Sequence, residues 1–292
     1  MNLQVVPRSL RMAHGSAAAL RGVERSAALC ALWRAMESAA ASPLIQDPLA
    51  AALAEAALGD EAAKLRGATF APSLQYLVSL RGWIIDEALD AWLHRHSACQ
   101  VVQLAVGCDT RASRLGHRGA MWFEVDTPRV AAFRRRFFSA NDRAVQLGVD
   151  LTGPISLHDA LVEGGFRRDL PAAWICEGLF EYHDEAFADR LLAEIGGLSG
   201  MGDQMLLLAV LDLYWLQYLK EQHAQKPVRL AWKSSRLPGL QKVSARIAAH
   251  GWKLQEVTSE MRLAEQMPRE GAQVESLFHV LRACDSKIAG VS

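Results

Sequence analysis

The central part of the chain alternates between short apolar runs and segments whose apolar residues recur at helical spacing. The short runs predict five strands, at Val101–Val106, Met121–Val125, Ala144–Val149, Ala173–Cys176 and Gln204–Val210. The helical patterns between them cover Arg111–Gly116, Pro128–Ser139 and Glu185–Leu198. Alternating strands and helices are typical of βαβ crossovers, and near-continuous apolar strands are typical of a sheet covered on both faces. We therefore predict an α/β fold with a mostly parallel sheet.

The flanking segments predict helices at one end and a hairpin at the other. Ala28–Leu58 predicts two helices broken at its prolines, and Leu74–His94 predicts a longer helix. Two late apolar runs, Trp252–Val257 and Val274–Leu281, predict a hairpin at a sheet edge. Residues 1–20 carry few periodic signals and predict a mobile arm. The whole pattern amounts to a seven-stranded sheet with N-terminal helices.

The helical patterns give way to strands near residue 96. Residues 1–96 are expected to form an N-terminal helical arm and cap, and residues 97–292 the α/β core. Within that core, about residues 212–250 show no clear strand and predict a helical insertion. Its aromatic side chains suit a lid over a small-molecule pocket, although packing of an amphipathic helix explains them equally well. They are Tyr214, Trp215, Tyr218 and Trp232.

Charge and composition restrict the classes of partner. The 32 basic and 32 acidic residues balance, which leaves no electrostatic footprint for nucleic acid or for an anionic membrane. The short basic run Arg134-Arg135-Arg136 predicts a solvated helix face. The five cysteines form no CxxC pair and the histidines show no ligand spacing, so we expect no disulfide framework and no metal. Without a secretory signal or a transmembrane-length apolar run, the sequence predicts a cytoplasmic protein that acts on a small molecule, and it leaves the oligomeric state open.

Small and acidic residues follow four consecutive strands. They are Gly107, Asp126, Asp150 and Glu177. In an open α/β sheet a ligand binds outside the carboxyl ends of the strands. Asp126 follows Gly107 by about twenty residues, the distance at which an acid reaches a ribose diol in a nucleotide-binding fold. Although Asp126 could instead cap the helix that begins near Pro128, the four strand ends together predict a nucleotide-type site.

The loop after the first strand indicates which kind of nucleotide would bind. It runs Ala105-Val106-Gly107-Cys108-Asp109 and lacks the GxGxxG pattern. A pyrophosphate cradle needs several glycines and a helix N-terminus that faces the phosphates. The loop therefore favours a cofactor without phosphates.

Several stretches resemble a known family. Gln100–Leu115 (QVVQLAVGCDTRASRL), Phe123–Pro128 (FEVDTP) and Glu177–Tyr182 (EGLFEY) carry the likeness, with Arg81–Asp86 (RGWIID) matching more loosely. The N-terminal Arg34-Ala35 and Asp47-Pro48 also fit. Over roughly residues 25–290 the chain resembles the leucine carboxyl methyltransferase-like family. The likeness is strongest to its bacterial O-methyltransferases of polyketide and other natural-product pathways.

The resemblance implies a class I methyltransferase fold, Rossmann-like, that binds S-adenosylmethionine. By position, Gly107 would contact the methionine moiety and Asp126 the ribose hydroxyls, while Asp150 and Leu151 would contact the adenine. Ala105 stands where the family usually has the first glycine of this loop, which narrows the loop slightly.

The resemblance assigns the two ends of the methionine to two charged residues. Arg81 would pair with the carboxylate, and Glu177 would accept from the amino group. A guanidinium suits a carboxylate because it can bind it in a bidentate manner. Without the family, Arg81 could equally be a surface arginine paired with Asp86 or Glu87.

The reaction predicted is O-methylation of a carboxyl or hydroxyl group on a small natural-product intermediate. Tyr182 and His183 follow the fourth strand and are the candidate catalytic residues, although an ordinary loop and cap would also explain them. The alternative is an enzyme that cyclises S-adenosylmethionine itself, releasing azetidine-2-carboxylate and methylthioadenosine. A module that binds the cofactor without turnover is the third possibility, and none of the three fixes the acceptor.

Overall fold

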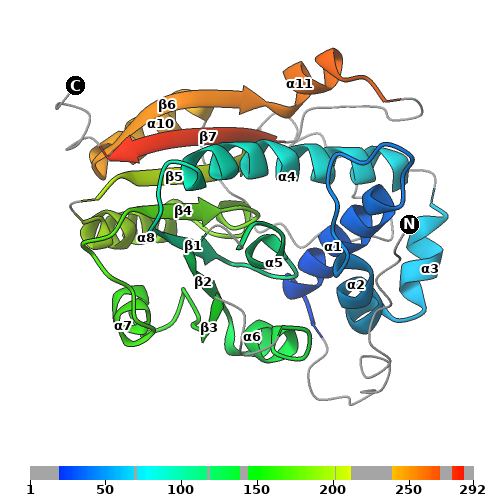
Figure 1. Ribbon diagram of the computed structural model, residues 1–292, viewed down its shortest axis with the longest axis horizontal. Helices are drawn as coiled ribbons and strands as arrows, with labels where there is room; N and C mark the ends of the chain where they lie inside the picture. Colours follow the sequence, from blue (N-terminus) through cyan, green and yellow to red (C-terminus); the bar gives the residue numbers. More distant parts are fainter. Residues whose placement is uncertain are drawn as a thin grey trace.

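A seven-stranded sheet forms the centre of the protein (Figure 1). The computed structural model describes residues 20–68, 71–116, 119–138, 144–200, 202–211, 239–269 and 278–285. Within these residues the strands are β1 (Gln100–Leu104), β2 (Met121–Asp126), β3 (Ala144–Gly148), β4 (Ala172–Cys176), β5 (Gln204–Leu211), β6 (Trp252–Ser259) and β7 (Phe278–Asp285). Their order in the sheet is β3-β2-β1-β4-β5-β7-β6. The first five pair in parallel, and β7 runs antiparallel to both β5 and β6.

The sequence predicts the central strands correctly because β1, β2, β4 and β5 place buried apolar residues on both faces of the sheet. Val101 and Trp122 pack on one side of the sheet, whereas Val102 and Phe123 pack on the other. The late pair is antiparallel as predicted, but the last strand extends beyond Leu281 to Asp285, which pairs in register with Trp252. The predicted start of that run, residues 274–277, lies outside the described residues.

Helices cover both faces of the sheet. One face carries α4 (Ala71–Leu93), α5 (Arg111–Leu115) and α11 (Glu260–Gln266). The other carries α7 (Leu157–Glu163), α8 (Glu185–Leu198) and α10 (Gly239–Ala249). The sequence pattern did not predict α7, α11 or the short α3 (Glu61–Arg66). No helix in the described ranges is long and apolar enough to span a bilayer.

The N-terminal helices form a separate core at one end of the sheet (Figure 1). α1 (Glu24–Ser38) and α2 (Ala50–Leu58) confirm the predicted pair of helices, and α3 follows them. Leu32 and Leu53 are fully buried there together with Phe133 of α6 (Pro128–Arg134). The expected arm, residues 1–19, lies outside the described residues. The N-terminal helices are thus anchored on the same part of the core that carries the strand ends.

Only the end of the predicted lid insertion is described. Residues 212–238, with all four of its aromatic residues, lie outside the described residues. The remainder of the stretch is α10, whose Val243 and Ile247 are buried in the core cluster that covers one sheet face. This helix therefore packs on the sheet and leads into β6, so the part of the insertion beyond residue 238 is not a lid.

Candidate active site

Two adjoining cavities lie at the carboxyl ends of β1 to β4. The larger has a volume of about 810 Å³ and is bounded by the start of α1, the four strand ends and α8. The smaller has a volume of about 220 Å³ and is bounded by α1, α4 and the loop after β1. Six residues line both cavities: Ser26, Ala27, Ala105, Gly107, Gly178 and Tyr182. The larger volume falls in the range of about 300–1,000 Å³ typical of ligand sites.

Gly107 lines both cavities and Asp126 lines the larger one, so the two predicted strand-end residues lie together at the cavity wall. Gly107 has φ +54°, and a Cβ there would lie 2.5 Å from the Cβ of Ala27. Its N–H donates to Asp126 Oδ2 at 2.7 Å, and the N–H of Thr127 donates to Oδ1 at 2.7 Å. Burial raises the pKa of Asp126 despite these two bonds. The helix cap is Thr127, whose hydroxyl accepts from the N–H of Val130, so Asp126 remains directed at the cavity.

Asp150 and Leu151 lie on the wall of the larger cavity, beyond the end of β3. The Asp150 carboxylate is exposed, and it accepts from the N–H and the hydroxyl of Thr152 at 2.9 and 2.7 Å. These bonds lower its pKa. The carbonyl of Leu151 accepts from Arg190 at 3.1 Å. Thr152 thus holds Asp150 ionised at the rim of the cavity.

Arg81 is buried and points at Glu177, not at Asp86 or Glu87. Its Nε donates to Glu177 Oε1 at 2.7 Å, and its guanidinium lies 4.3 Å from the centre of the Phe278 ring. A second arginine, Arg111, donates to Glu177 Oε2 at 2.7 Å. Burial alone would raise the pKa of Glu177, but the two positive charges outweigh burial and lower it. Glu177 is therefore an ionised carboxylate on the wall of the smaller cavity.

Arg111 is the centre of a charged cluster to which the sequence analysis gave no role. It donates to Asp86 at 2.6 Å and to Asp109 at 2.5 Å, and its own side chain is 1% exposed. Asp86 also pairs with Arg114. Asp109, Arg111 and Arg114 lie in the quoted stretch Gln100–Leu115, but the buried pairing of the two arginines with Asp86 of α4 depends on how distant segments pack.

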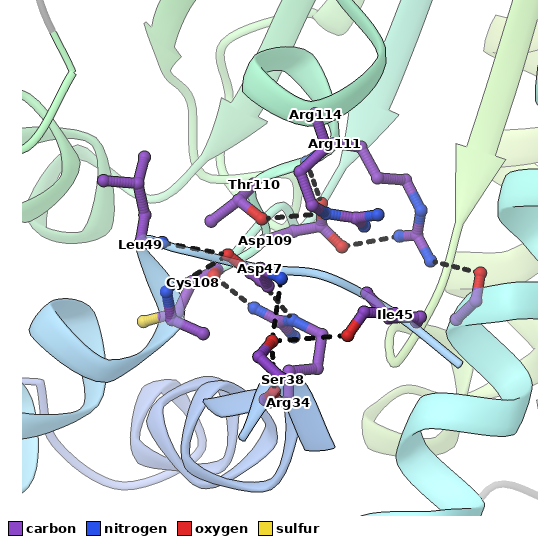
Figure 2. A network of polar contacts seen from close by, with 12 residues as sticks. Arg34, Ser38, Ile45, Asp47, Leu49, Cys108, Asp109, Thr110, Arg111 and Arg114 are labelled. Carbon is purple, nitrogen blue, oxygen red and sulfur yellow. Dashed lines mark hydrogen bonds and ion pairs between the residues drawn. The ribbon is translucent and has the colours of Figure 1, made fainter. Parts of the chain in front are cut away.

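A neighbouring network ties the N-terminal helices to the loop after β1 (Figure 2). Arg34 of α1 donates to Asp47 at 2.9 Å and to the carbonyl of Cys108 at 2.6 Å. Asp47 in turn accepts from the N–H of Ala50 at the start of α2. The two motif residues quoted for the family resemblance thus bind one another and fix the loop that contains Gly107.

Arg134 corrects the expectation of a solvated basic run. Its side chain is completely buried and pairs with Glu124 of β2 at 2.6 Å. It also donates to the carbonyls of Gly107 and Asp109, at 2.9 and 2.6 Å. Arg135 is exposed, so only part of the run faces solvent. The spacing of charges along one helix could not reveal that Arg134 is buried, because its partner Glu124 lies on a strand.

The candidate catalytic residues Tyr182 and His183 lie at different places. Tyr182 lines both cavities, and its hydroxyl donates to Ser26 Oγ at 3.1 Å. His183 lines only the larger cavity and stacks on Phe187, with ring centres 3.8 Å apart. Their catalytic roles stay a prediction, and of the two only Tyr182 touches the junction of the cavities.

Glu181 is an acid at the site that the sequence analysis did not single out. It lines the smaller cavity, is 4% exposed and lies within the short turn of helix at Phe180–Tyr182 that follows β4. Burial raises its pKa to about 7. The EGLFEY block contains it, but nothing in a linear sequence distinguishes a buried acid from an exposed one.

The comparisons with known proteins agree on one family. A sequence model described as leucine carboxyl methyltransferase matches residues 27–196. The chain is 33% identical over 257 residues to a candidate S-adenosyl-L-methionine-dependent methyltransferase of Parafrankia sp. (strain EAN1pec), covering 82% of this chain and 79% of that protein. A similar protein of Mycolicibacterium smegmatis is 30% identical, covering 88% and 94%. The chain belongs to the leucine carboxyl methyltransferase family.

This methyltransferase depends on S-adenosylmethionine, as do the relatives by their names. A solved structure of a candidate methyltransferase from Thermobifida fusca is similar, with a TM-score of 0.58 at 14% identity over 88% of this chain and 94% of that one. That likeness and the strand order confirm the predicted class I methyltransferase fold.

The residues at the strand ends suit this cofactor. The backbone at Gly107 approaches Ala27 so closely that a side chain would fill the passage between the cavities. Asp126 offers a half-buried carboxylate on the large side of that passage, and Glu177 with Arg81 offers both signs of charge on the small side. A nucleoside on one side and a zwitterionic amino acid on the other match these groups.

Proposed function

We propose that this methyltransferase transfers a methyl group to an oxygen atom of a small natural-product intermediate. The observation that carries the proposal is the pair of adjoining cavities, of which the smaller combines a charged end with apolar walls. Leu29, Trp33, Leu74 and Val78 contribute to those walls. Such a lining suits the apolar body of a small acceptor.

The larger cavity would hold the adenosine part of the cofactor. Asp126 would accept from the ribose hydroxyls, and Asp150 with Leu151 would contact the adenine. Ribose diols donate two hydrogen bonds, so they would satisfy a carboxylate that is otherwise largely buried. The ionised Asp150 at the rim can accept from an exocyclic amino group.

The smaller cavity would hold the methionine part, with Arg81 toward its carboxylate and Glu177 toward its ammonium. Gly107 would contact the chain between the two parts. Arg111 acts behind Glu177, because it binds the carboxylate and keeps it ionised, while Asp109 holds Arg111 in place.

S-adenosylmethionine supplies a methyl group that is already activated on a positively charged sulfur. The protein therefore contributes mainly orientation and the exclusion of water. Ser26 and Tyr182 would close the passage between the cavities, since both line each cavity and bind one another. Tyr182 and His183 remain the predicted polar groups for handling a carboxyl or hydroxyl acceptor, with Tyr182 nearer to the junction.

Product analysis tests the proposal. Purified protein is incubated with S-adenosylmethionine alone and with a panel of small acids, alcohols and phenols, and the nucleoside products are separated. Acceptor-dependent S-adenosylhomocysteine is expected. Methylthioadenosine formed from the cofactor alone would overturn methyl transfer and favour cyclisation to azetidine-2-carboxylate.

A binding control checks the cofactor assignment independently of turnover. Asp126→Ala should lose affinity for S-adenosylhomocysteine, measured by calorimetry, whereas Asp159→Ala on the exposed face of α7 should bind like the wild type. Wild-type affinity in Asp126→Ala would show that the ribose does not bind at this strand end.

A further inference from the structure

Glu181 is a buried acid at the smaller cavity to which neither the family motifs nor the proposed cofactor contacts give a role. Its Oε2 is buried and finds no hydrogen-bond partner among the described residues. Buried carboxylate oxygens are normally hydrogen-bonded, because an unsatisfied one costs about 1–3 kcal/mol or more. This oxygen therefore needs a hydrogen-bond donor, which we expect a ligand to supply.

The surroundings of Glu181 indicate the kind of ligand. Its backbone lies beside Tyr182, whose side chain borders the passage to the larger cavity. Apolar side chains of α1 and α4 bound the same space. A second buried acceptor, Gln103 Oε1, also lacks a partner among the described residues and lines this cavity. A ligand that carries a hydrogen-bond donor on an apolar body would satisfy these acceptors and pack against the apolar walls.

We propose that Glu181 is the general base of this methyltransferase and that its acceptor is a phenol. This inference rests on the proposed function, since it names the acceptor class and the base for the same methyl transfer. The hydroxyl donates to the Glu181 carboxylate, and the ring packs against Trp33 and the neighbouring aliphatic side chains.

The step balances with groups already named. The phenol O–H bond breaks and its proton passes to Glu181. The oxygen electron pair forms the new bond to the transferred methyl carbon, and the bond from that carbon to sulfur breaks with its electrons left on sulfur. The proton leaves Glu181 to water when the methyl ether departs.

The charges that face Glu181 support a phenol over a carboxylate acceptor. The ionisable groups on the elements packed around it are Cys30 and Arg34 of α1, Arg81 of α4, Asp109 of the loop after β1, and Glu177 and Tyr182 on its own segment. Each of the three arginines of this region is already paired with a carboxylate: Arg34, Arg81 and Arg111. With Arg81 taken by the methionine carboxylate and Arg34 by Asp47, a carboxylate acceptor would meet Glu177 and Glu181 with no further arginine among the described residues that line the cavity.

The acid–base balance also suits a phenol. With a pKa of about 7, Glu181 is half ionised at neutral pH, which is the range that favours a general base. A phenol with a pKa of about 10 lies within reach of such a base, whereas a carboxylate needs no base. Burial raises the pKa of the Cys30 thiol, so this neighbour stays protonated.

The test uses naphthol and naphthoate, which share a ring system and differ in the acceptor group. Their binding to the full chain saturated with S-adenosylhomocysteine is measured by calorimetry at about pH 6 and pH 8. Ionisation of Glu181 should weaken the binding of naphthoate by about tenfold across this range, the effect of roughly one like-charge contact. The binding of naphthol should not weaken. Glu181→Gln should abolish the pH dependence for naphthoate, and the exposed control Glu185→Gln should keep it.

Turnover is the second readout. Methylation of naphthol by the wild type should rise with pH, reach half of its maximum near pH 7 and level off about one pH unit higher, because only ionised Glu181 accepts the proton. Glu181→Gln should lose about 100-fold or more in kcat and the pH step with it. Tighter or equal binding of naphthoate at pH 8, or unchanged kcat in Glu181→Gln, overturns the inference.

If carboxylates alone are methylated, the inference fails while the proposed function stands. If methylthioadenosine forms from the cofactor alone, the proposed function fails, and the calorimetry still decides whether Glu181 recognises a phenol.

Discussion

Two residues of the loop after β1, a glycine and an alanine, have the same left-handed backbone conformation. Gly107 has φ +54° and Ala105 has φ +53°. The left-handed region costs a residue with a Cβ about 1–2 kcal/mol, and Ala105 is the only non-glycine residue in it among those described. The sequence showed that a glycine was missing here but not that the position needed one, since φ is not visible in a sequence.

Ala105→Gly is expected to stabilise the protein slightly. It relieves the strained φ, whereas the greater freedom of glycine in the unfolded chain offsets about 0.5–1 kcal/mol of the gain. The net change should be an increase of up to about 1 kcal/mol in the free energy of unfolding, measured by urea denaturation. Gly107→Ala is the opposing control, because its Cβ would meet Ala27 at 2.5 Å, and it should destabilise the fold. A stability loss in Ala105→Gly would contradict the strain.

Glu181 should also make the stability depend on pH. Its pKa is raised from 4.5 to about 7 in the folded protein, so its stabilising contribution is complete below about pH 4.5 and is lost as the pH rises through about 7. Glu181→Gln removes this loss. Relative to the wild type, the variant should gain about 3 kcal/mol in the free energy of unfolding between pH 4.5 and pH 8. Urea denaturation at both pH values checks this, and a difference that does not change with pH would show that Glu181 titrates normally.

At the scale of elements, the sequence predicted existence and type better than ends and partners. The helix predicted at Pro128–Ser139 begins at Pro128, where Thr127 caps it, but ends at Arg134. Local signals such as a cap and a proline are written in the sequence. The sequence does not show which side of α6 faces β2, so it does not distinguish the buried Arg134 from its exposed neighbours.

The ion pair between α6 and β2 should be essential to both elements. Arg134→Met leaves Glu124 charged and buried without its partner, which typically costs about 3–5 kcal/mol. The free energy of unfolding by urea should fall by that amount, and cofactor affinity should fall as well, because Arg134 also holds the carbonyls of Gly107 and Asp109. Arg135→Met, at the exposed neighbour, should change stability by less than about 0.5 kcal/mol. Equal effects of the two variants would contradict the buried pair.

At the scale of the whole molecule, the proposed cofactor site is shared between the sheet and the N-terminal helices. α1 contributes Ser26 and Ala27 to both cavities. It is held on the core by Arg34, which reaches Cys108, and by Glu24, which accepts from the Thr127 hydroxyl at 3.0 Å. The strand ends could be predicted from the sequence because they follow regular elements. The contribution of α1 could not, since it depends on packing between segments about a hundred residues apart.

This shared site implies that cofactor binding and the docking of α1 stabilise one another. S-adenosylhomocysteine at a hundredfold its Kd should stabilise the protein by about 2.7 kcal/mol, and amide hydrogen exchange should slow in α1 as well as at the strand ends. α7, which lines neither cavity, should show little local change. Arg34→Met loosens the contact of α1 with the loop after β1 and, since coupling between linked sites is typically about 5–150-fold, should weaken cofactor affinity within that range. Arg25→Met on the same helix removes only a surface pair with Glu61 and should bind normally. If Arg34→Met keeps wild-type affinity while α1 exchanges faster, the helix is a passive cover, and the two parts of the molecule bind the cofactor independently.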